Sequence, residues 1–107
     1  MMLSRVQIPK TAKPGEVVEI RIAIQHPMET GHRMDEMGHT IPANVVNHFV
    51  CKYAGKEIFS AEMGTGIAAN PYLAFFTVAS VSGDVEFSWV DDKGETGTAA
   101  FALTVSA

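Results

Sequence analysis

Residues 18–25 read VEIRIAIQ, in which valine and isoleucine alternate with glutamate, arginine, alanine and glutamine. In an extended chain the apolar side chains of such a stretch share one face and the others share the opposite face, which is typical of a β-strand with one buried side. Pro14 and Gly15 precede the stretch and indicate a turn. We therefore expect a strand over residues 18–24.

Further segments of this kind follow, separated by short turns rich in glycine and aspartate. They cover residues 6–8, 47–53, 56–63, 72–81, 85–90 and 96–105. Residues 72–81 are apolar on both faces, which favours a central strand. No stretch keeps a helical period over the length of a helix. The sequence predicts one all-β domain over residues 1–107, an immunoglobulin-like antiparallel β-sandwich of about seven strands.

Composition and charge exclude several classes of protein. The chain has 107 residues with 8 Lys and Arg against 12 Asp and Glu, a formal charge of −4, and it has no basic run. It therefore lacks the electrostatic signature of a nucleic-acid binder. The single cysteine, Cys51, rules out an internal disulfide. No apolar run reaches the ~18–20 residues of a membrane span, and the first residues lack the apolar core of a secretion signal. Taken alone, these features favour a cytoplasmic protein.

One long segment, residues 26–44, interrupts the alternation. Loops longer than ~12–15 residues are uncommon in compact domains and are often functional. Thioether and imidazole groups together suit copper, so a copper-binding loop is one interpretation, although the spacing matches no recognised metal motif. A solvated loop is the other interpretation. The residues concerned are His26, Met28, His32, Met34, Met37 and His39.

No catalytic, cofactor-binding or metal-binding residue is assigned. His48 and Cys51 are three residues apart on one strand, so their side chains point to opposite faces and cannot pair. Cys51 is expected in the core. The carboxylates of the second half are expected on a solvated rim (Asp84, Glu86, Asp91, Asp92 and Glu95). A small enzyme with a pocket near His26 and Asp35 is a remaining alternative.

The apolar segment 72–81 predicts a protein interface. The outer face of each sheet of a sandwich normally meets solvent, so aromatic residues on both faces imply that something covers one of them. The cover is either a partner or the long loop of the same chain. Tyr72, Phe75 and Phe76 are the candidate anchors.

Four sequence blocks together resemble the SoxZ family. They are HPMETG at residues 26–31, IP at 41–42, IAANPY at 67–72 and FSWVDDKG at 87–94. The resemblance implies the non-catalytic subunit of a SoxYZ complex in bacterial thiosulfate oxidation. It also implies an obligate heterodimer with SoxY, which carries sulfur intermediates on a cysteine in a C-terminal arm, and transient contacts with other Sox enzymes.

The resemblance carries two more expectations. Location is expected to be periplasmic, by export together with a signal-bearing SoxY. The partner interface is expected to include His26, Met28, Asn70, Pro71, Tyr72, Phe75 and Phe76. Two other functions stay open, a periplasmic copper-binding sandwich that uses the His/Met loop and a general interaction module.

Overall fold

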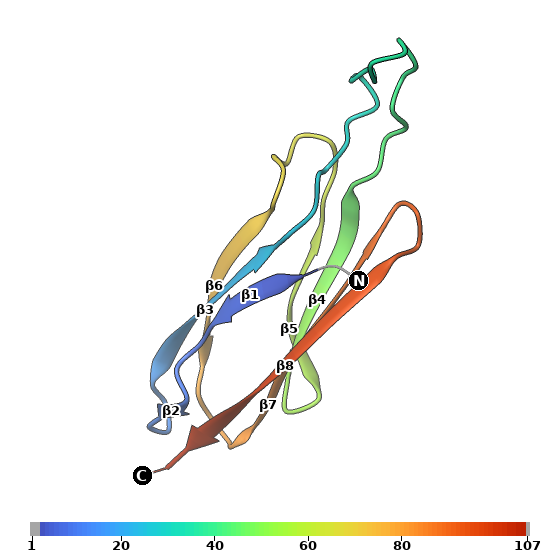
Figure 1. Ribbon diagram of the computed structural model, residues 1–107. Helices are drawn as coiled ribbons and strands as arrows, with labels where there is room; N and C mark the ends of the chain where they lie inside the picture. Colours follow the sequence, from blue (N-terminus) through green and yellow to red (C-terminus); the bar gives the residue numbers. More distant parts are fainter. Residues whose placement is uncertain (1–2, 107) are drawn as a thin grey trace.

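The computed structural model describes residues 3–106, which form two sheets lying face to face (Figure 1). One sheet has three strands in the order β1-β3-β6, and the other has five in the order β2-β8-β7-β4-β5. The strands are β1 (Ser4–Gln7), β2 (Thr11–Ala12), β3 (Val17–Ile24), β4 (Val46–Tyr53), β5 (Lys56–Glu62), β6 (Tyr72–Val78), β7 (Gly83–Asp91) and β8 (Thr96–Val105). The expected fold class, an all-β sandwich, is confirmed.

The core lies between the sheets and follows the alternation seen in the sequence. Ile20 and Ile22 of β3 and Phe87 of β7 are almost fully buried. The ring of Phe49 on β4 lies 6.1 Å from that of Phe87 and 6.4 Å from that of Trp89, measured between centroids. Each large apolar side chain buried in this way contributes about 1.5–3 kcal/mol. Cys51 lies in the core, as predicted, together with Phe87 and Trp89.

Two details of the strand prediction differ from the structure. Strand β2 was not expected, because two residues are too short to show a period; it pairs in parallel with the end of β8. Strand β6 was expected in the centre of a sheet, and this is wrong, since it pairs only with β3 and lies at the edge. Apolar residues on both faces identify a strand but not its neighbours, because the pairing is set by distant residues.

Residues 26–44 project from the sandwich as an arm (Figure 1). Bridges join Glu29 to Asn44 near its base and Met34 to Thr40 near its tip, so the segment is a loose two-stranded ribbon rather than an irregular loop. The molecule measures 61 × 19 × 19 Å, with a Cα radius of gyration of 16.3 Å. A compact domain of this length has a radius of gyration of about 13 Å, so the molecule is markedly elongated. Within residues 3–106 there is no helix that is long and apolar enough to cross a membrane.

Candidate functional site

The outer face of the three-stranded sheet carries an apolar patch. Side chains of β6 alternate, so that Phe75 faces the core while Tyr72 and Phe76 point outward. The register places Phe76 beside Glu19 and Val78 beside Val17 of β3. The exposed fractions are 58% for Tyr72, 65% for Phe76, 53% for Val78 and 62% for Val17. These four outward-facing side chains are called the outer patch.

The polar residues within this face compensate one another. Arg21 donates from Nε to Glu19 Oε1 at 2.8 Å, and its Nη2 lies 2.6 Å from the same oxygen. The hydrogen bond and the charge of Glu19 raise the pKa of Arg21. An exposed pair of this kind adds little to stability. Because the two charges cancel, the Arg21–Glu19 pair adds no net charge beside the patch.

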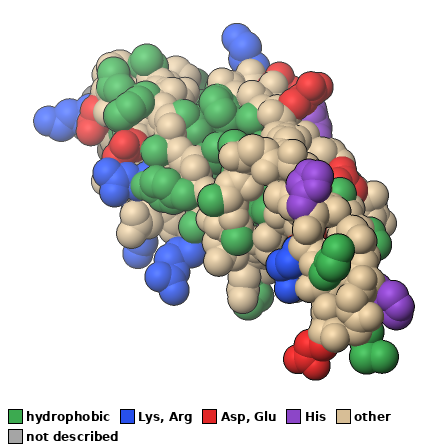
Figure 2. Space-filling view, turned by 90° about the horizontal axis from the view of Figure 1, so that it is seen from above, with side chains coloured by type: hydrophobic (Ala, Val, Ile, Leu, Met, Phe, Trp, Pro, Cys, Tyr) green, Lys and Arg blue, Asp and Glu red, His purple; other side chains and the backbone are tan. Residues whose placement is uncertain are grey.

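The patch is too apolar to be explained as ordinary surface. Single exposed apolar residues are normal, whereas two exposed aromatic rings and two exposed valines on one sheet face are typical of an interaction site. Tyrosine and phenylalanine bury about 150–250 Å² each when they are covered. Seen from above, hydrophobic side chains gather over the body of the sandwich, with charged and histidine side chains around them (Figure 2). The arm does not cover the patch, because both rings remain more than half exposed.

The structure divides the seven residues expected at the partner interface into two groups. Asn70, Tyr72 and Phe76 are exposed. Four are buried within the chain itself, namely His26, Met28, Pro71 and Phe75. Phe75 stacks on Phe59 with ring centroids 4.3 Å apart. The outward face of β6, which the sequence left open, is therefore the one with Tyr72 and Phe76.

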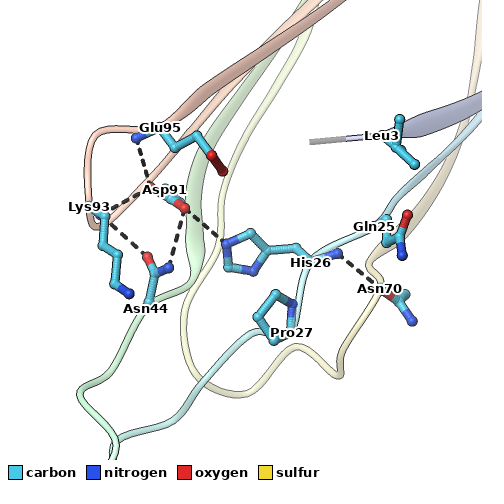
Figure 3. A pocket seen from close by; sticks show the side chains of 9 residues that line it. All are labelled: Leu3, Gln25, His26, Pro27, Asn44, Asn70, Asp91, Lys93 and Glu95. Atoms are coloured by element: carbon cyan, nitrogen blue, oxygen red, sulfur yellow. Dashed lines mark hydrogen bonds and ion pairs between the residues drawn. The ribbon is translucent and has the colours of Figure 1, made fainter. Parts of the chain in front are cut away.

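The second site is polar and lies at the base of the arm, where His26 meets the turn between β7 and β8 (Figure 3). His26 Nε2 lies 3.1 Å from Asp91 Oδ2, and the Met28 N–H donates to His26 Nδ1 at 2.9 Å. Because Nδ1 accepts a hydrogen bond, the proton sits on Nε2 and is donated to Asp91. Asn44 donates to the same carboxylate oxygen at 3.3 Å. The backbone N–H of His26 donates to Asn70 Oδ1 at 3.0 Å.

Each carboxylate oxygen of Asp91 accepts two hydrogen bonds. Its second oxygen, Oδ1, accepts from the N–H groups of Lys93 at 3.0 Å and Glu95 at 2.9 Å. Burial alone raises the pKa of Asp91, but the hydrogen bonds from His26, Glu95, Asn44 and Lys93 outweigh it and lower the pKa below its ordinary value. The expectation of a solvated Asp91 is wrong, because its main side-chain partner lies 65 residues away. With every polar atom of the pair bonded internally, the cluster ties the arm to the sandwich.

The structure does not bring the six candidate copper ligands together. His26 and Met28 are buried at the base and bonded there, as described above, whereas Met34 lies in the bridge near the tip and Met37 lies beyond it, and both are exposed. Among residues 3–106, no group of three or more His, Cys, Asp or Glu is placed to hold a metal ion.

The alternative enzyme pocket, expected near His26 and Asp35, is not built from both residues: His26, Asn70 and Asp91 line a pocket at the base of the arm, and Asp35 does not. Asp35 accepts hydrogen bonds from the N–H groups of Met37 and His39 in the turn at the tip, whereas His26 is fixed at the base of the arm. Cys51 is fully buried, and burial raises the pKa of its thiol to about 12. Since a thiol nucleophile acts as the thiolate, Cys51 is unreactive in the folded chain.

Comparison with known protein families settles the family. Residues 6–102 match the family described as "Sulphur oxidation protein SoxZ". The chain belongs to the SoxZ family. The resemblance noted from the sequence blocks is thereby confirmed, and the chain is a protein of the Sox sulfur-oxidation system.

Solved structures with the same fold include two distinct groups of proteins. A superoxide reductase (neelaredoxin) from Ignicoccus hospitalis superposes with a TM-score of 0.72 at 14% identity, covering 96% of this chain and 80% of that one. The sulfur carrier protein SoxY from Chlorobium limicola f thiosulfatophilum superposes with a TM-score of 0.67 at 10% identity, covering 97% and 79%. At such low identity the likeness shows a shared fold. Comparison with curated protein sequences gives no significant match.

Proposed function

We propose that this SoxZ-family chain is the non-catalytic partner subunit of a SoxYZ carrier complex. In this proposal it binds SoxY as an obligate heterodimer through the outer patch. It then helps to present the cysteine-bound sulfur intermediates of SoxY to other Sox enzymes during thiosulfate oxidation. The observation that carries the proposal is the exposure of Tyr72 and Phe76 on a sheet face that the chain itself leaves uncovered.

A supporting role fits the chemistry of the described residues. The one cysteine is buried with a raised thiol pKa, and the buried His26–Asp91 pair has no free polar atom to act on a substrate. A permanent partner in turn needs a large apolar contact, because obligate interfaces resemble a domain core divided in two. The outer patch supplies the centre of such a contact.

The arm suits transient contacts with the enzymes. It extends from the end of β3 that pairs with Tyr72, and it exposes Met34 and Met37 near its tip. Methionine surfaces adapt to several partners because the side chain is flexible and polarisable. Both contacts belong in the periplasm under this proposal, with export of the chain bound to a signal-bearing SoxY.

Co-purification with SoxY from the same organism tests the proposal. We expect the wild-type chain to form a stable one-to-one complex. The Phe76→Glu variant should bind SoxY at least about 30-fold more weakly, since removing a central aromatic anchor and burying a charge costs 2 kcal/mol or more. Met37→Glu is the matched control, because Met37 is also exposed (80%) but lies near the tip of the arm rather than on the three-stranded sheet. Equal binding by all three chains would contradict the proposed interface, and no binding by the wild type would contradict the proposed function.

A further inference from the structure

The backbone of β6 offers a second kind of recognition besides the outer patch. The Ile24 N–H donates to the Pro71 carbonyl at 2.9 Å, and the Ala79 N–H donates to the Glu16 carbonyl at 2.8 Å. In an antiparallel pair the hydrogen-bonded residues alternate, so the backbone of residues 71, 73, 75, 77 and 79 faces β3. The backbone of residues 72, 74, 76 and 78 faces away from the sheet.

These four residues leave a row of unpaired peptide groups. Strand β6 pairs with β3 alone, so the outward N–H and C=O groups of Tyr72, Ala74, Phe76 and Val78 take no part in a ladder within residues 3–106. Such a row at the edge of a sheet is a template for another strand. The groups are spaced along seven residues, which is the length of an ordinary strand.

Strand β6 is an unprotected edge that lies beside the outer patch. Natural sheets protect their edges with charged residues, proline, short strands or a covering segment. Strand β5 reads KEIFSAE with three charges, and β1 has four residues including Arg5. Within residues 3–106, β2 pairs only with Thr104 and Val105 of β8, so residues 96–103 form a second uncharged edge. That edge belongs to the five-stranded sheet and not to the sheet with the outer patch. Strand β6 reads YLAFFTV, with no charge, no proline and no bulge in its pairing with β3.

From the open edge of β6 and the outer patch beside it, we infer that the partner adds an extended strand to β6 and so continues the three-stranded sheet. The inference rests on the proposed function and specifies how SoxY binds. The occupant is an uncharged or apolar strand of SoxY: its peptide groups pair with those of residues 72–78, and its outward side chains extend the outer patch. The neutral edge fits such a strand without leaving a charge unpaired, and addition of a strand to an exposed sheet edge is a common mode of protein recognition.

Amide hydrogen exchange in the purified complex tests the inference. In the chain alone at low concentration, the amides of Ala74 and Phe76 should exchange rapidly, whereas those of Leu73 and Phe75, which bond to β3, should be protected. In the complex with SoxY, the Ala74 and Phe76 amides should slow by about 100-fold, as expected for ladder hydrogen bonds. Leu73 and Phe75 serve as the internal control, because their amides are paired in both states.

A pair of proline variants gives an independent readout. Ala74→Pro removes an outward N–H that has no partner in the chain, and proline is tolerated at such edge positions. Ser60→Pro is the matched control on β5: the Met63 N–H donates to the Asn47 carbonyl, so the N–H of Ser60 also points outward in that ladder. Both variants should fold, and only Ala74→Pro should weaken SoxY binding, by tenfold or more.

The outcomes separate this inference from the proposed function. If Phe76→Glu prevents complex formation while the Ala74 and Phe76 amides stay unprotected in the wild-type complex, SoxY packs on the face without strand addition, and the inference is overturned alone. Protection of these amides in the chain without SoxY would overturn it as well, because a second copy would then occupy the edge. Absence of any complex would overturn both.

Discussion

Asp91 accepts four hydrogen bonds, and its contribution to stability depends on the charge that they hold. In Asp91→Asn one oxygen becomes an NH₂ group, which faces the donors of His26 or of the turn and cannot accept from them. We expect a loss of about 3 kcal/mol in the free energy of unfolding at pH 7. Urea unfolding measures it. Asp84→Asn, at an exposed position on the same strand, should change stability by less than about 0.5 kcal/mol.

The same residue predicts a dependence of stability on pH. The folded-state pKa of Asp91 lies below its ordinary value, so the ionised form stabilises the fold. This stabilisation is complete above the unfolded pKa of about 4 and is lost as the pH falls through the lower folded value. The stabilities of wild type and Asp91→Asn should therefore converge as the solution is acidified from pH 5 to pH 3. A constant difference over this range would contradict the assignment.

Gly97 makes room for the indole of Trp89. The two residues are directly opposite each other in the β7–β8 ladder, and a Cβ at position 97 would lie only 2.3 Å from Nε1 and Cε2 of the indole. We expect Gly97→Ala to destabilise the fold by about 1–3 kcal/mol through overpacking and to shift the tryptophan fluorescence. Gly64→Ala is the control, because its Cβ would meet no atom within 4 Å. Equal stability of the two variants would contradict this packing.

At the scale of secondary structure, the sequence predicted where the strands lie in the chain more reliably than which strands pair with one another in the sheets. Strands β3, β4, β7 and β8 were recognised because each buries one face, which produces a period of two. The edge position of β6 was not recognised, because local sequence does not record which strands lie alongside. The His26–Asp91 pair was missed for the same reason. The local sequence gave one signal for this pair, namely that His26 and Asp91 are polar residues at the ends of strongly apolar strands.

The core is expected to be stable without the outer part of the arm. Of the arm's residues, Met28 near its base is the one that belongs to the buried cluster. Replacing residues 32–40 by a two-glycine turn should therefore change the melting temperature by less than about 4 °C, the shift that 1 kcal/mol produces in a domain of this size. Met28→Ala should cost about 2–5 kcal/mol, because Met28 is buried. Thermal unfolding followed by circular dichroism compares the two, and a large loss on shortening the arm would show that it supports the core.

At the scale of the whole molecule, one long side of an elongated domain is left uncovered. A chain of 107 residues buries most of its apolar surface in a single core, yet Tyr72, Phe76 and two valines remain outside it on one sheet face. Sequence alone predicted that one face of this strand needs a cover. It could not decide between the arm and a second polypeptide, because the direction of the arm depends on the cluster at its base.

An environment-sensitive dye distinguishes an uncovered patch from an ordinary surface. Anilinonaphthalene sulfonate fluoresces when it binds exposed apolar surface, so the isolated folded chain should enhance its emission. The Tyr72→Ser/Phe76→Ser variant should lose most of this enhancement while keeping its thermal transition, because neither side chain belongs to the buried core. Adding SoxY should suppress the wild-type signal to the level of the variant. If the wild-type chain is folded and monomeric but does not enhance the emission of the dye, the patch is too small or too hydrated to hold a permanent partner.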